Sequence, residues 1–292
     1  MLHTFAIQLI NGITQGMMYA MVAIGLTMIY GVMRVLHIAH AAVYVFGAYI
    51  GLLFFDVTHN LFVAIVLSMI CSGFLGILIE YFIYRRIAEK SRTVVLIASI
   101  GLLIFITDAI RLVAGPLERA FPAKIKFSLP SGLSALGVAE MKVVILSITA
   151  VVIFLLWAFM TRTKIGFGIR ALAQNREIAS AMGINVERCI SIVFFASSAM
   201  AAVGGVLIGV YYNLVAPYMG DVVAYKALAI IVIGGFGSIL GTIIGGLCLG
   251  ISETFIIGYT NIQFSREGIA MLFLVLLILF RPNGILGKGE RR

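Results

Sequence analysis

Charged residues are scarce in this chain. Asp, Glu, Lys and Arg make up 11% of it and hydrophobic residues 62%, whereas an average soluble domain is about one-quarter charged and about one-half apolar. This composition excludes an ordinary soluble domain and predicts a membrane protein. The net charge of +9 does not indicate nucleic-acid binding, because the basic residues are dispersed through short segments between apolar stretches.

Cysteine is also rare. Cys71, Cys189 and Cys248 fall within or at the edge of apolar stretches, with no paired spacing. The sequence therefore suggests neither a disulfide framework nor a metal cluster, and we expect the cysteines to pack as small apolar side chains. The first residues, MLHTFAIQLI, lack a basic residue and a small-residue cleavage site. We expect them to belong to the first helix and not to a removable signal peptide.

Long apolar stretches dominate the sequence, and several reach the roughly 20 residues that a helix needs to cross a bilayer. We expect helices near residues 5–33, 38–55, 61–84, 93–113, 142–160, 189–211, 222–236, 239–258 and 268–281. The seventh is short for a full crossing. The sequence thus predicts one all-α polytopic membrane domain over residues 1–292, with about eight or nine transmembrane helices.

Lys and Arg are distributed unevenly between alternate connecting segments. Fourteen of the 21 lie in segments 31–35, 85–92, 161–188 and 281–292, and four lie in segments 56–60, 114–141, 212–221 and 259–267. Loops rich in Lys and Arg stay in the cytoplasm. We therefore expect the first set inside and the amino terminus outside, provided that residues 222–258 make an even number of crossings.

The two longest connecting segments, 114–141 and 161–188, are too short for an independent core. We therefore expect no soluble catalytic domain. The outer segment, 114–141, carries three prolines and alternates apolar and polar residues over 123–129, which is typical of a short hairpin or a surface-lying segment. It could be a connecting lid or a docking surface for an external partner.

The inner segment, 161–188, carries the signals of a short capped helix of about two turns. Asn175 is a good N-cap, Glu177 suits the positive end of the helix dipole, and Gly183 stands where a left-handed residue ends a helix. A second cap, Asn185, starts the next helix, which enters the membrane.

An apolar face is expected on this short helix, because Ile178 and Met182 are four residues apart and Ala179 lies beside them. Two interpretations remain open. The face docks in a groove of a partner protein, or the helix lies flat at the lipid surface.

Glycine is abundant, and small residues recur every four positions. The repeats are Gly12, Gly16 and Ala20; Gly47 and Gly51; Ala201, Gly205 and Gly209; Gly241 and Gly245; and Gly246 and Gly250. Because small residues let helix backbones approach closely in a membrane, this pattern predicts a tightly packed bundle.

Two stretches are expected to interrupt helices, so that one or two helices are broken or re-entrant. One is RVLHIAHAAVYVFGAY, residues 34–49, and the other is VIGGFGSILGTIIGG, in which Gly234, Gly235 and Gly237 cluster. Paired interruptions of this kind are typical of a transport site, where the freed backbone lines a cavity. A repeat relating the two would be parallel.

Few ionisable residues fall inside the expected spans: Glu80, Asp108, Arg111, Lys226 and Glu253. Asp108 and Arg111 are three residues apart, and we expect them to pair on one helical face. Glu253 is the least explained. The five do not form the series in depth that a proton relay needs.

His37 and His40 lie three residues apart in the first interrupted stretch, with no Cys, Asp or Glu nearby to complete a metal site. We interpret them as neutral hydrogen-bonding groups at a hinge or at the inner, cytoplasmic end of a translocation path. The first helix also carries a polar stripe, which either lines a pore or packs against neighbouring helices; it consists of Gln8, Asn11, Gln15 and Tyr19.

Four stretches together carry a resemblance to a known family. They are NGITQGMMYAMVAIGLTMIYGVMRVLHIAHAAVYVFGAY, RALAQNREIASAMGINVERCI, YKALAIIVIGGFGSILGTIIGGLCLGISE and LFRPNGILG. The chain resembles the membrane permease of the branched-chain (hydrophobic) amino acid class of ABC importers over nearly its whole length. It departs from the usual family motif at His37 and Ala41. The solute therefore stays open among branched-chain amino acids, urea, short amides and aromatic acids.

The resemblance implies half of an importer pore in a prokaryotic inner membrane. The implied partners are a second related permease chain, identical or not, two ATP-binding subunits and an external solute-binding protein. The glycine-rich stretch from Gly234 lacks the Gly-Lys-Ser/Thr ending of a Walker A motif. We therefore expect this chain to be no enzyme and to hold no cofactor, with ATP hydrolysed on the partner subunits.

The resemblance also assigns a coupling helix for the ATPase, carried by Ala171, Asn175, Glu177, Ile178, Ala179, Met182 and Gly183. Our candidates for the translocation path or hinge are Asn11, Gln15, His37, His40, Tyr44, Gly235, Gly237 and Ser238. An alternative function is an ion-coupled secondary transporter of a small solute, which would work without ATPase partners. A channel is a further alternative.

Overall fold

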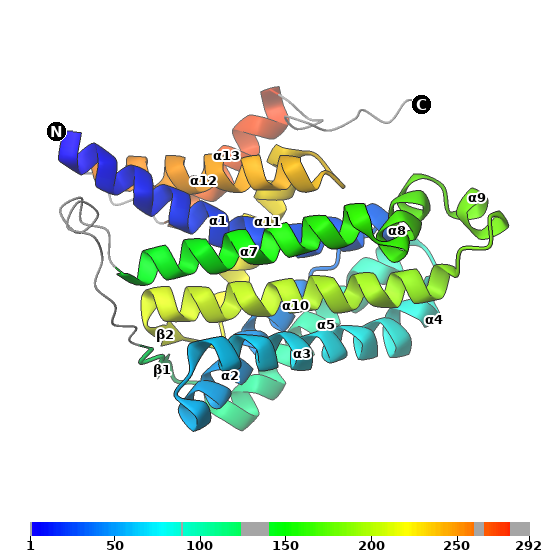
Figure 1. Cartoon of the computed structure of the whole chain (residues 1–292), viewed down its shortest axis with the longest axis horizontal. Coiled ribbons are helices and arrows are strands. Elements are labelled where there is room, and N and C mark those ends of the chain that lie inside the picture. The colour runs from blue at the N-terminus through cyan, green and yellow to red at the C-terminus, as the bar shows by residue number, and fades with distance from the viewer. Residues whose placement is uncertain (1, 89, 124–139, 260–265, 281–292) are drawn as a thin grey trace.

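The computed structural model describes residues 2–88, 90–123, 140–259 and 266–280, and these form a bundle of long helices (Figure 1). The first half contains α1 (Leu2–Met33), α2 (His40–Thr58), α3 (Leu61–Ile79), the π-helical turn η1 (Glu80–Tyr84), α4 (Arg85–Ile87), α5 (Arg92–Ala114) and β1 (Arg119–Ala120). The second half contains α7 (Glu140–Arg162), α8 (Lys164–Gln174), α9 (Arg176–Ala181), α10 (Val186–Tyr212), β2 (Leu214–Val215), α11 (Met219–Gly234), α12 (Ile239–Tyr259) and α13 (Arg266–Phe280). The predicted all-α polytopic fold is confirmed.

Seven helices of the described part are long and apolar enough to cross a bilayer: α1, α2, α3 continued to Ile87, α5, α7, α10 and α12. Helix α11 has 16 residues and therefore rises about 24 Å, which is less than the roughly 30 Å of the hydrocarbon layer. This agrees with the short seventh stretch expected from the sequence. Helix α13, with 15 residues, is shorter still.

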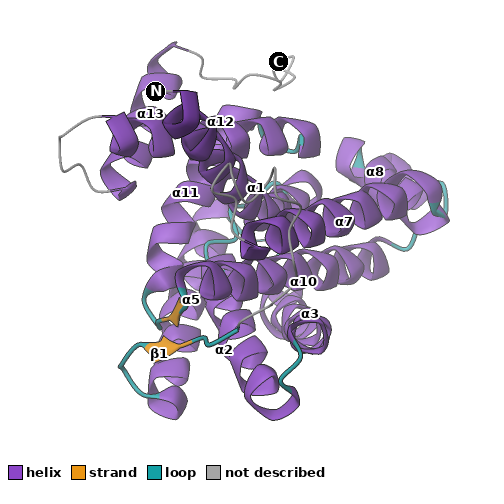
Figure 2. Ribbon diagram, turned by 60° about the vertical axis from the view of Figure 1, so that its left-hand side comes forward, coloured by secondary structure: helices purple, strands orange, loops and turns teal. Residues whose placement is uncertain are grey.

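The two ends of the bundle carry different elements. Strands β1 and β2 lie at one end, and α8 and α9 project at the opposite end (Figures 1 and 2). The strands pair antiparallel, with Arg119 opposite Val215, and so join the two segments expected outside. Because α8 and α9 come from the segment expected inside, these two sets of segments lie at opposite ends of the bundle, as expected, and which end is cytoplasmic stays a prediction. The hairpin suggested for 123–129 lies, beyond residue 123, outside the described residues.

Glycines bring helix backbones into direct contact. A Cβ on Gly250 would lie 2.4 Å from the Cα of Gly16, and a Cβ on Gly16 would lie 2.7 Å from the carbonyl oxygen of Gly246. At the crossing of α2 and α10, a Cβ on Gly47 would lie 2.4 Å from the Cα of Ala202. Any larger residue would push these helices apart, so the close packing predicted from the four-residue repeats is confirmed.

Helices α1 and α10 form the interior of the bundle, whereas α5 and α7 lie at its periphery with much of their surface exposed. Large apolar side chains such as Phe105 and Leu112 on α5, and Phe154 and Leu155 on α7, are exposed. In a bilayer such faces contact lipid or another membrane chain. At the outer end of α5, Arg111 Nη1 lies 3.1 Å from Asp108 Oδ1, as expected from their spacing.

Both predicted interruptions occur. After α1 the chain turns at Arg34, with φ of 55°, and runs without helical structure until α2 begins at His40. Between α11 and α12, Gly235 and Gly237 have φ of 92° and 80°, a region that glycine adopts without steric cost. Helix α12 then starts behind Ser238, whose Oγ accepts a hydrogen bond of 3.1 Å from the following turn.

Candidate functional site

The candidate path residues do not converge on one site. Three cavities lie at different depths: an outer cavity bordered by Tyr44, a central cavity bordered by both histidines, and an inner groove bordered by Gly237 and Ser238. The remaining candidates border none of these three, and they are Asn11 and Gln15 on α1 and Gly235 at the end of α11.

The central cavity, of about 120 Å³, lies between α1, the segment leading into α2, and α11. His40 Nε2 is 3.1 Å from the carbonyl oxygen of Val22. Val22 precedes the end of α1 by eleven residues, or about 16 Å along the helix. His40 therefore does not lie at the inner end, one of the two positions expected for the histidines, and the other, at a hinge, stays a prediction. The chain between α1 and α2 is not helical, so its few residues reach back that far.

His37 lies between His40 and the cytoplasmic end of α3. Its Nδ1 is 2.5 Å from the hydroxyl oxygen of Tyr84, and its ring also packs against Phe194. Burial lowers the pKa of His37 well below its usual 6.5, and the neighbouring His40 lowers it further. His37 is therefore neutral near pH 7, which suits a hydrogen-bonding role better than proton carriage. Among the described residues, His37 Nε2 and His40 Nδ1 have no hydrogen-bond partner.

The outer cavity, of about 280 Å³, lies beside the paired strands and has a lysine in its wall. Lys226 Nζ is 2.8 and 3.0 Å from the two carboxylate oxygens of Glu253 and donates to Tyr19 Oη at 2.9 Å. Both charged side chains are almost completely buried, Lys226 at 2% exposed and Glu253 at 0%. Glu253, unexplained in the sequence, is thus the partner of Lys226 and connects α12 to α11.

The outer and central cavities both border α11, over overlapping stretches of the helix. Val223 borders both, Val222 and Lys226 border the outer one, and Leu228 borders the central one. The inner groove, of about 630 Å³, lies elsewhere. It is formed by α7, α8, the start of α12 and the opposite face of α1, where residues 17, 28 and 31 point away from Val22. The outer and central cavities therefore adjoin at α11, whereas the inner groove lies on the other side of α1.

The capping signals of the inner segment are confirmed. Asn175 Oδ1 accepts from the backbone N–H of Ile178 at 3.0 Å, Asn185 Oδ1 accepts from Arg188 at 3.0 Å, and Gly183 has φ of 80°. Helix α9 has six residues, which agrees with the predicted length of about two turns. Helix α8 before it, with Ala171 near its end, was not predicted.

The exposed apolar face of α9 consists of two residues, not three. Ile178 and Met182 are 63% and 78% exposed, whereas Ala179 is 1% exposed. The expectation that Ala179 belongs to this face is wrong, because one residue turns the helix by about 100° and brings Ala179 against the bundle.

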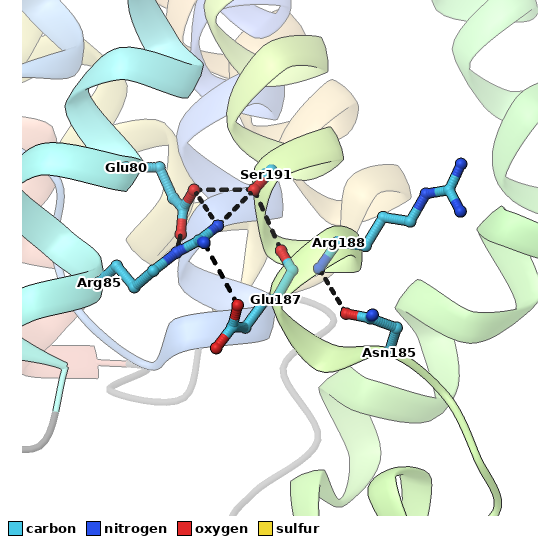
Figure 3. A network of polar contacts seen from close by, with 6 residues as sticks. All are labelled: Glu80, Arg85, Asn185, Glu187, Arg188 and Ser191. Atoms are coloured by element: carbon cyan, nitrogen blue, oxygen red, sulfur yellow. Dashed lines mark hydrogen bonds and ion pairs between the residues drawn. The ribbon is translucent and has the colours of Figure 1, made fainter.

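Directly after α9, the first turn of α10 is tied to the end of α3 by a polar cluster (Figure 3). Arg85 forms two hydrogen bonds of 3.0 Å to the carboxylate of Glu80 and one of 3.2 Å to Glu187. The hydroxyl of Ser191 donates to Glu80 at 2.8 Å. Glu80 opens the π-helical turn η1, a form that is often found at functional sites.

Comparisons with known proteins decide the family. The sequence model described as "Branched-chain amino acid transport system / permease component" matches residues 8–281. The chain belongs to this permease family.

Relatives of this permease match it over nearly their whole length. A high-affinity branched-chain amino acid transport system permease protein LivH of Salmonella typhimurium is 33% identical over 98% of this chain and 96% of its own. The BraD protein of Pseudomonas aeruginosa, which carries the same description, is 34% identical over 97% of this chain and 96% of its own. A solved structure described as PsaBC from Streptococcus pneumoniae in complex with Fab is 15% identical, with a TM-score of 0.49, and covers 94% of this chain and 91% of that one.

In this permease, a series of contacts connects the start of α10 with the central cavity. Glu187 on α10 contacts Arg85, Arg85 holds Glu80 at the start of η1, and Tyr84 at the end of η1 contacts His37. Sequence reasoning missed this series and the Lys226–Glu253 pair, because both join residues far apart in the chain. The one available signal was the presence of opposite charges inside membrane spans, which usually pair.

Proposed function

We propose that this chain is the permease subunit of an ATP-driven ABC importer in a prokaryotic inner membrane. It moves branched-chain amino acids, or a related small solute, that an external binding protein delivers. Membership of the permease family and the near full-length match to LivH and BraD support this function. The chain is a transport subunit and no enzyme, since ATP is hydrolysed on separate partner subunits.

The structural observation that supports an ATPase partner is the exposed pair Ile178 and Met182 on α9. The helix is fixed by its caps and projects from the inner end of the bundle (Figure 1). A rigid helix that presents two large apolar side chains to the cytoplasm suits a groove on a partner protein. The two ATP-binding subunits are the proposed partners here, and a second related permease chain completes the pore within the membrane.

The double variant Ile178→Asp with Met182→Asp tests the ATPase contact, since it places two charges in an apolar groove. We expect the chain to insert normally, and we expect ATPase activity stimulated by the solute-loaded binding protein to fall at least about tenfold in the reconstituted complex. Ser180→Asp is the matched control, because Ser180 is exposed on another face of the same helix. Equal activity in the double variant and the wild type would contradict the assignment.

The same reconstitution separates this function from an ion-coupled secondary transporter. Proteoliposomes that contain the permease chains without ATPase subunits should take up no solute under a pH or sodium gradient. Uptake that appears only with the partner subunits and internal ATP supports the importer. Gradient-driven uptake by the permease alone would favour the alternative.

A further inference from the structure

We infer that the Lys226–Glu253 pair binds the two charged groups of a zwitterionic amino acid as it passes through the outer cavity. This inference rests on the proposed function and names a binding site for its substrate. Lys226 faces the solute carboxylate, and Glu253 faces the solute ammonium group. The apolar side chain of the solute lies against the rest of the cavity wall.

The position of the pair supports this role. Lys226 lines the outer cavity together with Tyr19 and Tyr44, and the Glu253 carboxylate, which is not part of the cavity wall, lies 2.8 and 3.0 Å from the lysine ammonium. The cavity lies at the end of the bundle that carries the paired strands, which is the outer end. A solute released by an external binding protein therefore meets this lysine before it reaches the central cavity.

The charges explain why a zwitterion fits. In a low-dielectric interior an unpaired charge is costly, so neither Lys226 nor Glu253 can lose its partner unless another charge replaces it. A zwitterion supplies both replacements at once. Lys226 then pairs with the solute carboxylate and Glu253 with the solute ammonium group. Two ion pairs replace one, and each charge has a partner.

Tyr44 provides a second, independent observation. Its side chain is fully buried and borders the outer cavity. Its hydroxyl oxygen has no hydrogen-bond partner among the described residues. A buried hydroxyl without a partner is unfavourable, and a solute carboxylate beside Lys226 would supply the missing acceptor. The apolar part of the wall, with Ile208, Met219 and Val222, suits an aliphatic side chain.

The site also discriminates between the solutes that the sequence left open. Urea and short amides carry no charge, so Lys226 and Glu253 stay paired with each other. An aromatic acid without an amino group engages Lys226 and offers Glu253 no positive charge in exchange. Only a solute with both charges satisfies both residues.

The first test is the doubly apolar variant Lys226→Met with Glu253→Leu in the reconstituted importer. Replacing a buried pair by apolar residues of similar size is often tolerated by a fold. If the pair only holds α11 to α12, the assembled variant should take up L-leucine at the wild-type rate. If the pair binds the solute, the uptake rate at saturating leucine-loaded binding protein should fall at least about tenfold in an assembled complex.

The second test does not depend on the double variant assembling. Tyr44→Phe removes only a hydroxyl that has no partner in the fold, so a merely structural role predicts no effect. We expect it to lower leucine uptake several-fold. Tyr49→Phe, the control, also removes a buried hydroxyl without a partner among the described residues, on the same helix but away from this cavity. Its uptake should match the wild type.

The outcomes separate the inference from the proposed function. Wild-type leucine uptake with ATP inside, together with a loss in Tyr44→Phe that Tyr49→Phe does not share, supports the inference. Wild-type rates in Tyr44→Phe, or in an assembled double variant, overturn it and leave the importer function intact. Failure of the wild-type complex to take up leucine while it takes up urea overturns both the amino-acid substrate and the site.

Discussion

The chain contains two clusters built from the same chemistry in different surroundings. In each, a basic side chain connects a carboxylate on one helix with a neighbouring element. Lys226 and Glu253 are enclosed together beside the outer cavity, at 2% and 0% exposed. Arg85 and Glu187 lie at the inner end of the bundle and are 31% and 68% exposed, and only Glu80 of that cluster is buried.

The difference shows which cluster can exchange partners. The inner cluster has a bidentate arginine and a serine hydroxyl, and its arginine is partly exposed, so Glu80 keeps one partner when the other is lost. The outer pair is buried, and the Lys226 ammonium lies 4.4 Å from the ring centre of Tyr19. For the outer pair, a charged solute in the cavity is the natural replacement. The inner cluster is suited to transmit a change of position between α10 and η1, and the outer pair is suited to bind a charged solute.

The largest expected effect is that of Lys226→Met alone. It removes the cationic partner of the buried Glu253 carboxylate, at a cost of about 3 to 5 kcal/mol. We expect a clear loss of monodisperse complex on size-exclusion chromatography and a lower midpoint of thermal unfolding. The double variant with Glu253→Leu serves as control and should recover most of the yield. A single variant as stable as the wild type would show that Glu253 is not sealed from water.

A smaller effect is expected for Arg85→Met at the inner end. Glu80 loses its bidentate partner but keeps the Ser191 hydroxyl at 2.8 Å, so we expect a loss of about 2 to 3 kcal/mol. Because the cluster connects the start of α10 to η1, stimulation of the ATPase by the binding protein should fall as well. The double variant Arg85→Met with Glu80→Gln, which removes both charges, should recover more of the stability than of the ATPase stimulation. Equal recovery of stability and stimulation would show that the cluster has only a structural role.

Between the two clusters lies His40, and its variants test the polar character of the central cavity. His40→Leu leaves the Val22 carbonyl without its imidazole partner, at a cost of about 1 to 3 kcal/mol, and should lower uptake. His40→Gln keeps a hydrogen-bonding group and removes titration, so uptake should survive without a new pH dependence. Uptake into proteoliposomes across pH measures both. Equal loss in the two variants would contradict the polar-path interpretation of this histidine.

Local signals in the sequence were enough for most of the fold. The spans follow from apolar length, the starts of α9 and α10 from Asn175 and Asn185, and the close packing of helices, though not which helices meet, from glycines spaced by four. Each of these depends on residues within one or two helical turns. For that reason they can be predicted from a single sequence.

The candidate site was less predictable, because it depends on contacts between distant segments. No local pattern pairs Lys226 with Glu253 or brings Tyr84 to His37. The depth of His40 depends on how far the non-helical segment after α1 folds back, and spacing does not determine that distance. Ala179 was placed on the wrong side of α9 because a short helix has too few residues to define an apolar face.

The smallest effect is expected for Glu187→Gln. This carboxylate is 68% exposed and contacts Arg85 at 3.2 Å, and exposed ion pairs contribute less than about 1 kcal/mol and are screened by salt. We expect unchanged complex stability and a slight loss of ATPase stimulation at low ionic strength, which vanishes at high salt. Stimulated ATPase activity measured across salt concentrations, with Arg188→Gln as a control outside the ion pairs of this cluster, checks this. A loss as large as that of Arg85→Met would mean that Glu187, and not Glu80, is the main partner of the arginine, and the contrast between an enclosed and a solvated cluster would no longer hold.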